Sequence, residues 1–387
     1  MSIYFLNLLI TLSCVLIGRF IYTSGKLGTL IASLLFSLPM AFIAGVRSLT
    51  MGTDLGVYGE FNFRMASQFS QIADYYQYLK QINGTEYGYA VLNFWVSRFS
   101  MDIHWFLFIL SLFTLLPFFI GAIRFEQKFS VPVVMQTVFY FTIFYGPSFN
   151  EMRQSLAMGW VYLSCSYLFE NTSPRKKSLY VLLTWIIAVS FHRTAIIEGM
   201  IIFIYLYLHQ ETTTTGKGLK RFSLILLGSA ILLVAFTLLN RGAFASSINK
   251  YASYLDGSNS LVQKTIGIRR IISLTMMPML SFSLVGLWLK NQKKASRNVA
   301  DMMLFEAVMI LDMLFLWAGL RGAIFPRLGQ YFSMFEAVAV FLPAIFFESK
   351  QARWIYFILT CVYYICVFIV ITRTGENQIY PYAWIFN

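Results

Sequence analysis

The chain has 387 residues and a formal net charge of +13; 58% of its residues are hydrophobic and 12% are charged. Soluble domains carry about 25% charged residues, so this composition excludes an ordinary soluble protein. Five runs contain no charged side chain, and each is long enough to cross the ~30 Å hydrocarbon layer of a bilayer. These runs are residues 27–46, 129–150, 222–240, 271–289 and 354–372.

Several classes of site are excluded by the residue types. The cysteines lie in apolar runs without a CxxC pattern or a nearby His, which argues against a disulfide scaffold or a metal site. No Walker loop, Rossmann glycine pattern, HExxH or GxSxG occurs, so we expect no cofactor. No nucleic-acid-binding motif accompanies the positive charge, so nucleic acid is not an expected partner. The four cysteines are Cys14, Cys165, Cys361 and Cys366.

The hydrophobic pattern predicts an all-α, polytopic membrane protein with about twelve transmembrane helices and a single membrane domain over residues 1–387. The first run lacks basic residues before Arg19 and has no cleavage pattern, so it is interpreted as a retained span. The predicted spans are 3–22, 27–46, 103–123, 131–147, 153–169, 178–191, 194–208, 222–240, 271–289, 302–320, 331–347 and 354–372.

The basic residues divide unequally between the two sides of this topology. Short alternate loops, together with Arg19, hold 10 Lys and 6 Arg, which marks their side as cytoplasmic and places both termini outside the cytoplasm. The other side holds 11 Arg and only 3 Lys, and has the two long loops 47–102 and 241–270. Arginine is favoured where phosphate or carboxylate is gripped, because guanidinium is a planar fork of donors. The alternative for each Arg is anchoring to lipid headgroups.

The first polar cluster, residues 45–61, follows the second predicted span and contains Arg47, Asp54 and Tyr58. In one interpretation Asp54 caps a helix that begins there. In the other, Arg47 holds a phosphate while Asp54 accepts a hydroxyl proton or binds a sugar. Tyrosines continue over residues 62–87, where they suit either sugar rings or a membrane-interface belt.

Two further clusters lie at predicted span ends. Arg153 and Gln154 occupy the first turn of a span, where free N–H groups would help to attract an anion. His192 and Arg193 separate two spans that are short for a full crossing, so their turn is predicted at the floor of a cavity. Glu198 is the expected partner of this pair, in either a structural or a functional role.

Other arginines on the same side are further candidates for binding an anion. Arg269 and Arg270 are adjacent at an outer span end, and Arg327 flanks a short outer loop. Acidic residues inside predicted spans, Glu306, Asp312 and Glu336, are interpreted as partners of arginines from other helices.

Taken in order, these motifs resemble the EpsG family of exopolysaccharide proteins, within the Wzy-type polysaccharide polymerases. One departure is Leu55, where the family usually has an aromatic residue. The motifs that carry the resemblance are Arg47…Gly52-Thr53-Asp54…Tyr58, Arg153-Gln154-Ser155-Leu156-Ala157, Phe191-His192-Arg193-Thr194-Ala195, Arg327 with Tyr331-Phe332, and Tyr380-Pro381-Tyr382.

The resemblance implies a GT-C-like, multi-pass glycosyltransferase of the bacterial inner membrane. Such an enzyme transfers a growing glycan from undecaprenyl pyrophosphate to a lipid-linked repeat unit outside the cytoplasm, without a required metal. Its implied partners are the undecaprenyl-pyrophosphate-linked oligosaccharide, the lipid bilayer and, as a candidate, a chain-length regulator. This chemistry fits the charged clusters described above, and we expect substrate binding by Arg47, Tyr58, Arg153, Gln154, Arg193, Arg269, Arg270, Arg327 and Tyr382, with Asp54, His192 and Glu198 as the candidate catalytic residues.

Three other classes of protein share parts of this pattern. A lipid-linked oligosaccharide flippase would also have many spans and a basic cavity, but it needs charge accessible from both faces and often an internal repeat. No repeat is visible. An O-antigen ligase or membrane acyltransferase is a second rival, of which the ligase would share fold and donor and differ in its acceptor. A purely structural subunit is less favoured, because it would not need 11 outward arginines.

The topology is testable by labelling. A single cysteine at position 176 should resist impermeant thiol reagents in intact cells, because that loop is predicted to be cytoplasmic. Labelling in intact cells would refute the assignment.

Overall fold

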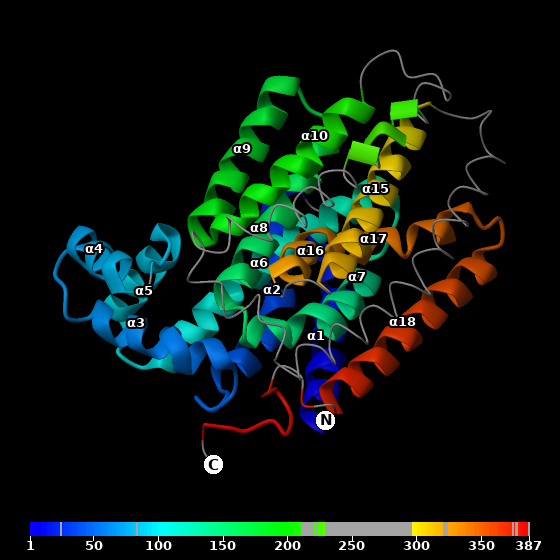
Figure 1. Ribbon diagram of the computed structural model, residues 1–387. Coiled ribbons are helices and arrows are strands. Elements are labelled where there is room, and N and C mark those ends of the chain that lie inside the picture. The colour runs from blue at the N-terminus through cyan, green and yellow to red at the C-terminus, as the bar shows by residue number, and fades with distance from the viewer. Residues whose placement is uncertain are drawn as a thin grey trace. The chain divides into compact units, whose positions relative to one another are not determined.

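The computed structural model describes most of the chain as helices (Figure 1). The only strand-like pairing among the described residues is an isolated antiparallel bridge between Arg47 and Trp384. The all-α prediction is therefore confirmed for this part of the chain. The described residues are 1–23, 25–82, 84–209, 220–221, 223–225, 227–228, 296–319, 324–373, 375 and 378–385.

The chain divides into two compact units. The first comprises residues 1–196 and 359–387, and the second comprises residues 197–358. The helices of the first unit are α1 (Ser2–Tyr22), α2 (Lys26–Gly45), α3 (Glu60–Ala66), α4 (Ile72–Ile82), α5 (Tyr87–Phe99), α6 (Ile103–Phe129), α7 (Val133–Tyr140), α8 (Met152–Leu168) and α9 (Pro174–Phe191), with most of α18 (Lys350–Arg373).

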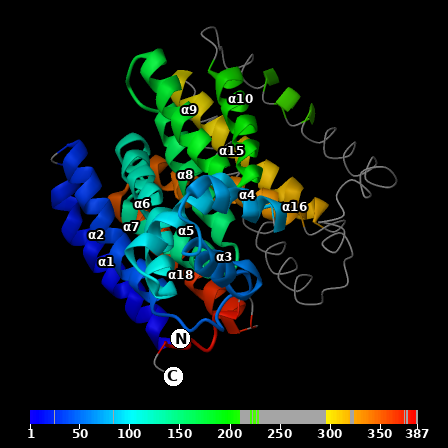
Figure 2. The ribbon, with the colours of Figure 1, turned by 90° about the vertical axis from the view of Figure 1, so that its left-hand side faces the viewer.

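The centre of the first unit is a bundle in which α2 packs on α1 and α6, α8 packs on α6, and α9 packs on α8 (Figures 1 and 2). Close helix contact depends on small residues, as is typical of membrane bundles. A Cβ added to Gly159 on α8 would lie 2.3 Å from the carbonyl oxygen of Thr114 on α6. The α6–α8 contact is thus closer than any side chain at position 159 would allow.

Four helices of the described chain are long and apolar enough to cross a membrane: α1, α2, α6 and α18. Large apolar side chains are exposed along them; Phe20 on α1, for example, is 84% exposed. Such surfaces suit a lipid environment, and the chain is an integral membrane protein. These four helices match predicted spans, whereas the total of twelve and the placement of the termini stay predictions.

Other predicted spans are shorter or interrupted. The span predicted over 131–147 continues from α7 into a π-helix, Phe141–Tyr145, and a 3-10 turn, Pro147–Phe149. The span predicted over 194–208 begins with 3-10 geometry, Arg193–Ile197, before α10 (Glu198–Leu208). The spans predicted over 222–240 and 271–289, and the loop 241–270, lie wholly or largely outside the described residues.

The segment 47–102, predicted as a long loop, is folded. A π-helix, Leu55–Gly59, leads into α3, and α4 and α5 follow (Figure 2). These helices share a small apolar cluster formed by Ala66, Tyr75, Leu79, Ala90 and Phe94. The Tyr75 hydroxyl donates to the Asn62 carbonyl at 2.7 Å, which ties α4 to α3.

In the second unit, α15 (Ser296–Ala318) packs against α10 and α16 (Ile324–Ser333). His209, at the end of α10, contacts Asp301 on α15 at 2.8 Å. The predicted span 331–347 is interrupted here, because α16 ends at Ser333 and only α17 (Glu336–Ala339) and a 3-10 turn, Leu342–Phe346, follow.

The α6–α8 contact generates a stability prediction. Gly159→Ala should lower the free energy of unfolding by about 1–3 kcal/mol, because a backbone carbonyl cannot yield to the new methyl group. Thermal unfolding in detergent measures the effect. Gly56→Ala is the matched control, since a Cβ there meets nothing within 4 Å. Equal melting temperatures for the two variants would contradict the packing described.

Candidate functional site

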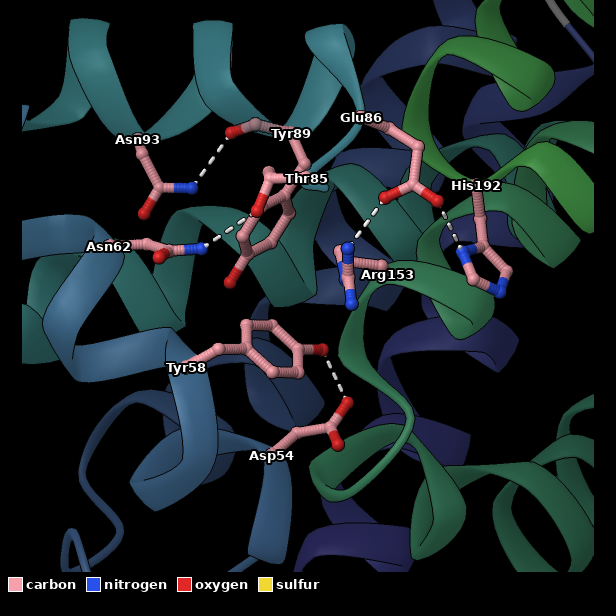
Figure 3. Close-up of polar contacts among 9 residues, drawn as sticks. All are labelled: Asp54, Tyr58, Asn62, Thr85, Glu86, Tyr89, Asn93, Arg153 and His192. Atoms are coloured by element: carbon pink, nitrogen blue, oxygen red, sulfur yellow. Dashed lines mark hydrogen bonds and ion pairs between the residues drawn. The ribbon is translucent and has the colours of Figure 1, made fainter. Parts of the chain in front are cut away.

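A polar cluster lies within the first unit where the segment 54–89 meets the start of α8 and the end of α9 (Figure 3). Its centre is the Glu86 carboxylate at the N-cap position of α5. Oε2 of Glu86 accepts from Nη1 of Arg153 at 2.6 Å, and Oε1 lies 3.1 Å from Nδ1 of His192. One carboxylate thus joins the first turn of α8 to the residue that ends α9.

The electrostatics of Glu86 follow from this geometry. Burial alone would raise its pKa, but the hydrogen bond from His192 and the charge of Arg153 outweigh burial and lower the pKa to about 2. Glu86 is therefore ionised at neutral pH. An ionised carboxylate can only accept hydrogen bonds, so Nδ1 of His192 must carry the proton in this contact. In the tautomer with the proton on Nδ1, Nε2 is the acceptor nitrogen of the ring.

Arg153 is also held by aromatic rings. Its guanidinium lies 4.3 Å from the ring centroid of Tyr58 and 5.9 Å from that of Tyr89. The Tyr58 hydroxyl donates to the Asp54 carboxylate. Cation–π contact strengthens when the pair is removed from water, and Tyr58 is buried. The guanidinium is thus fixed by a ring on one side and by a carboxylate on another.

Asp54 does not act as the predicted helix cap. It occupies the N-cap position of the π-helix Leu55–Gly59, but its side chain makes no capping hydrogen bond there. Its carboxylate is directed to Tyr58, one turn later. π-helical turns are rare overall, and those that occur are often found at functional sites. The contact of Asp54 with the Tyr58 hydroxyl favours a role of Asp54 in orienting Tyr58.

The loop before Asp54 is positioned by Asn150. The backbone N–H of Thr53 donates to Oδ1 of Asn150 at 2.7 Å. Gly52 has φ of 94°, and a Cβ there would lie 2.4 Å from the carbonyl oxygen of Phe149. Only glycine fits both the backbone conformation and the close approach. The Gly-Thr-Asp motif is therefore docked on the turn that precedes α8.

Arg47 is buried rather than exposed at an interface, with 2% of its surface accessible. Its guanidinium lies 4.2 Å over the Phe149 ring and 3.8 Å from the sulfur of Met152. Burial lowers the pKa of Arg47 to about 10, so it remains protonated at neutral pH. A phosphate could therefore reach Arg47 only if the residues around its side chain moved.

The structure brings together Asp54, Tyr58, Arg153 and His192 among the predicted residues. Arg193 is exposed directly after His192, Gln154 is buried in α8, and the Tyr382 hydroxyl donates to the Ile43 carbonyl at 2.7 Å. Glu198 is buried in α10, and Arg327 is partly buried in α16, both in the second unit; Arg269 and Arg270 lie outside the described residues.

Sequence reasoning missed Glu86, the residue at the centre, and assigned Glu198 as the partner of His192. The contact found at Nδ1 of His192 is with Glu86. A signal was present, since Glu86 is the only charged residue between Lys80 and Arg98. No group of three His, Cys, Asp or Glu side chains suited to a metal occurs in the described part of the chain.

The structure thus defines an integral membrane protein whose described part is helical and carries an Arg–Glu–His cluster at helix ends. Comparison with protein families identifies the family to which it belongs. The EpsG family profile matches residues 30–384, so the chain belongs to the EpsG family, a family of Wzy-like polymerase-type membrane proteins. Comparisons with curated proteins and with solved structures give no significant match.

The lowered pKa of Glu86 predicts a pH-dependent stability. The pKa falls from an ordinary 4.5 to about 2 in the folded protein, so its stabilisation is complete above pH 4.5 and is lost as pH falls towards 2. Glu86→Gln should remove this part of the acid destabilisation, as measured by thermal unfolding in detergent at several pH values. Glu60→Gln, in an exposed pair with Arg64, is the control and should keep it. Parallel pH profiles for wild type and Glu86→Gln would contradict the assignment.

Proposed function

We propose that the protein is a polysaccharide repeat-unit polymerase of the bacterial inner membrane. It transfers a growing glycan from undecaprenyl pyrophosphate to a lipid-linked repeat unit on the outer face. Membership of the EpsG family supports a Wzy-like polysaccharide polymerase. The observation that carries the chemistry is the Glu86 carboxylate, which holds an anion-binding guanidinium and an oriented imidazole side by side.

Arg153 is proposed to stabilise the leaving group. In glycosyl transfer the bond between the anomeric carbon and the pyrophosphate oxygen breaks, and negative charge grows on the pyrophosphate. A cation that is already fixed stabilises this charge more than the ground state, which is the kind of binding that accelerates a reaction. The Tyr58 ring and Glu86 hold Arg153 in this way. Arg193, exposed beside His192, is proposed as a second ligand.

His192 is proposed as the general base. The acceptor hydroxyl attacks the anomeric carbon, and its proton passes to Nε2 of the imidazole. Glu86 accepts from Nδ1–H, which fixes the tautomer and stabilises the imidazolium that forms. Asp54 is the alternative base of the sequence analysis. Its contact with the Tyr58 hydroxyl supports a positioning role beneath Arg153 instead.

A strain that lacks the gene distinguishes a polymerase from a flippase or a ligase when its glycans are examined by gel. A polymerase mutant should still present a single repeat unit at the cell surface, whereas a flippase or ligase mutant presents none. Loss of the single-unit band would refute the polymerase.

Complementation of that strain tests the residues. Arg153→Lys should abolish or shorten the polymer, because a point charge cannot replace the fork. His192→Gln should lower the polymerisation rate by about 100-fold or more, the usual contribution of a general base. Arg64→Lys, in an exposed pair with Glu60, is the matched control and should give normal polymer.

Asp54→Asn in the same strain decides between the two bases. A positioning carboxylate tolerates the amide, which still accepts from Tyr58, whereas a base does not. Polymer from Asp54→Asn together with none from His192→Gln supports His192. The reverse result would assign the base to Asp54, and normal chain lengths in Arg153→Lys would remove that residue from the site.

A further inference from the structure

The backbone around Arg47 pairs with a short C-terminal segment, residues 378–385, called the strap below. The strap pairs with the backbone around Arg47: Ser48 N–H donates to the Ala383 carbonyl at 2.8 Å, and Ile385 N–H donates to the Val46 carbonyl at 3.1 Å. The bridge between Arg47 and Trp384 lies between these two bonds. Further hydrogen bonds join the strap to the first helices: the Tyr4 hydroxyl donates to the Ile379 carbonyl, and the Tyr382 hydroxyl donates to the Ile43 carbonyl.

The charge of Arg47 has no acidic counterpart among the ion pairs of the described chain. Its Nε is buried, and no hydrogen-bond partner for it occurs among the described residues. Burial lowers the pKa of Arg47, and the titratable groups around it are tyrosines, Tyr145, Tyr382 and Tyr4 foremost, which carry no charge at neutral pH. A buried cation without a carboxylate is costly, and in membrane proteins it commonly marks a place where an anion binds.

The Tyr89 hydroxyl is a second buried polar atom of this unit, on a ring whose centroid lies 5.9 Å from the Arg153 guanidinium. The Tyr89 hydroxyl is fully buried, no hydrogen-bond partner for it occurs in the described ranges, and the charges of both arginines act on it. Phosphate oxygens accept from guanidinium and from phenol alike. The two side chains therefore offer a phosphate unused donors, one from Nε and one from the hydroxyl.

An apolar groove adjoins the strap. It encloses about 430 Å³ between α1 and α2, and Leu6, Ile10, Leu38, Phe42 and Trp384 are among the residues that line it. Trp384 thus borders the groove with its side chain and pairs with Arg47 through its backbone. A ligand with a hydrocarbon chain in this groove would carry its polar end towards the strap and Arg47.

We propose that Arg47 and the Tyr89 hydroxyl form a site for the phosphate of a lipid whose hydrocarbon chain lies in the α1–α2 groove, and that the strap must be displaced for this phosphate to enter. The proposal deepens the proposed function, on which it rests, by giving a carrier lipid a place distinct from Arg153. Its test measures ligand binding alone. The binding test can therefore fail while the polymerase proposal is supported in cells, and the polymerase proposal can fail while binding is observed.

The strap can be locked by a disulfide between Ser48→Cys and Ala383→Cys, which face each other across the backbone pair. All variants carry Cys366→Ser, because that native cysteine is exposed. Farnesyl pyrophosphate, a soluble isoprenoid pyrophosphate, is titrated by calorimetry into the purified full chain in detergent. Affinity should fall about tenfold or more on oxidation and return on reduction, since hydrogen bonds to a charged group are lost. Equal affinity in the two states would overturn the proposal.

Two variants of the site complete the test. Tyr89→Phe keeps the ring and should weaken binding severalfold, and Arg47→Gln should weaken it about tenfold or more and make it insensitive to oxidation of the locked pair. Leu38→Trp fills the groove, so it should weaken the binding of farnesyl pyrophosphate but not the binding of inorganic pyrophosphate. Ser48→Cys alone, treated with the same oxidant, is the control. Wild-type affinity in Arg47→Gln, or inorganic pyrophosphate bound as tightly as farnesyl pyrophosphate, would refute the lipid-phosphate site.

Discussion

The candidate site depends on one interaction, the contact of the Glu86 carboxylate with both Arg153 and His192. A buried carboxylate persists in its ionised form only when donors and positive charge surround it. Here they come from two different helices, and Glu86 itself comes from a third. The contact therefore fastens the folded segment 55–99 to the ends of α8 and α9, and the same three side chains that fix this junction are the ones suited to chemistry.

Two arginines of this unit, Arg47 and Arg153, differ in what holds them. Arg153 has a carboxylate at 2.6 Å and a tyrosine ring beneath it, so its orientation is set before any ligand arrives. Arg47 has a phenylalanine ring and a thioether sulfur, which neutralise no charge. This difference agrees with the two proposed roles. Arg153 would stabilise negative charge that forms during the reaction, whereas the surroundings of Arg47 would have to rearrange before it could bind an anion.

Polar clusters at span ends supplied four of the residues that the structure places in one cluster. Asp54, Tyr58, Arg153 and His192 stood out because charge beside an apolar run is rare, and the structure brings them together. Glu86 was missed because its partners lie 67 and 106 residues away in the chain, and nothing local specifies such pairings. Glu198 was preferred for His192 only because it is near in sequence.

The helices show the same division. Hydropathy identified α1, α2, α6 and α18, whose apolar runs are long and regular. It gave no sign of the π-helix at Phe141–Tyr145 or the break after Ser333, because a hydropathy average is blind to backbone geometry. The segment 47–102 was predicted as a loop for its low hydropathy. Its helices are held by the cluster around Tyr75 and Phe94, which depends on contacts between helices rather than on composition.

The pairing of the strap with Arg47 also has a consequence for how the protein is made. The strap residues that pair with the backbone around Arg47 follow it by more than 300 positions; in the same region, the hydrogen-bonded Tyr382 and Ile43 are 339 residues apart. During synthesis the Arg–Glu–His cluster can form once α9 has emerged, since all its members precede residue 196. The backbone around Arg47 must meanwhile remain without this pairing until residues 378–385 arrive. Pairing of the strap is thus a later event in biogenesis than formation of the Arg–Glu–His cluster.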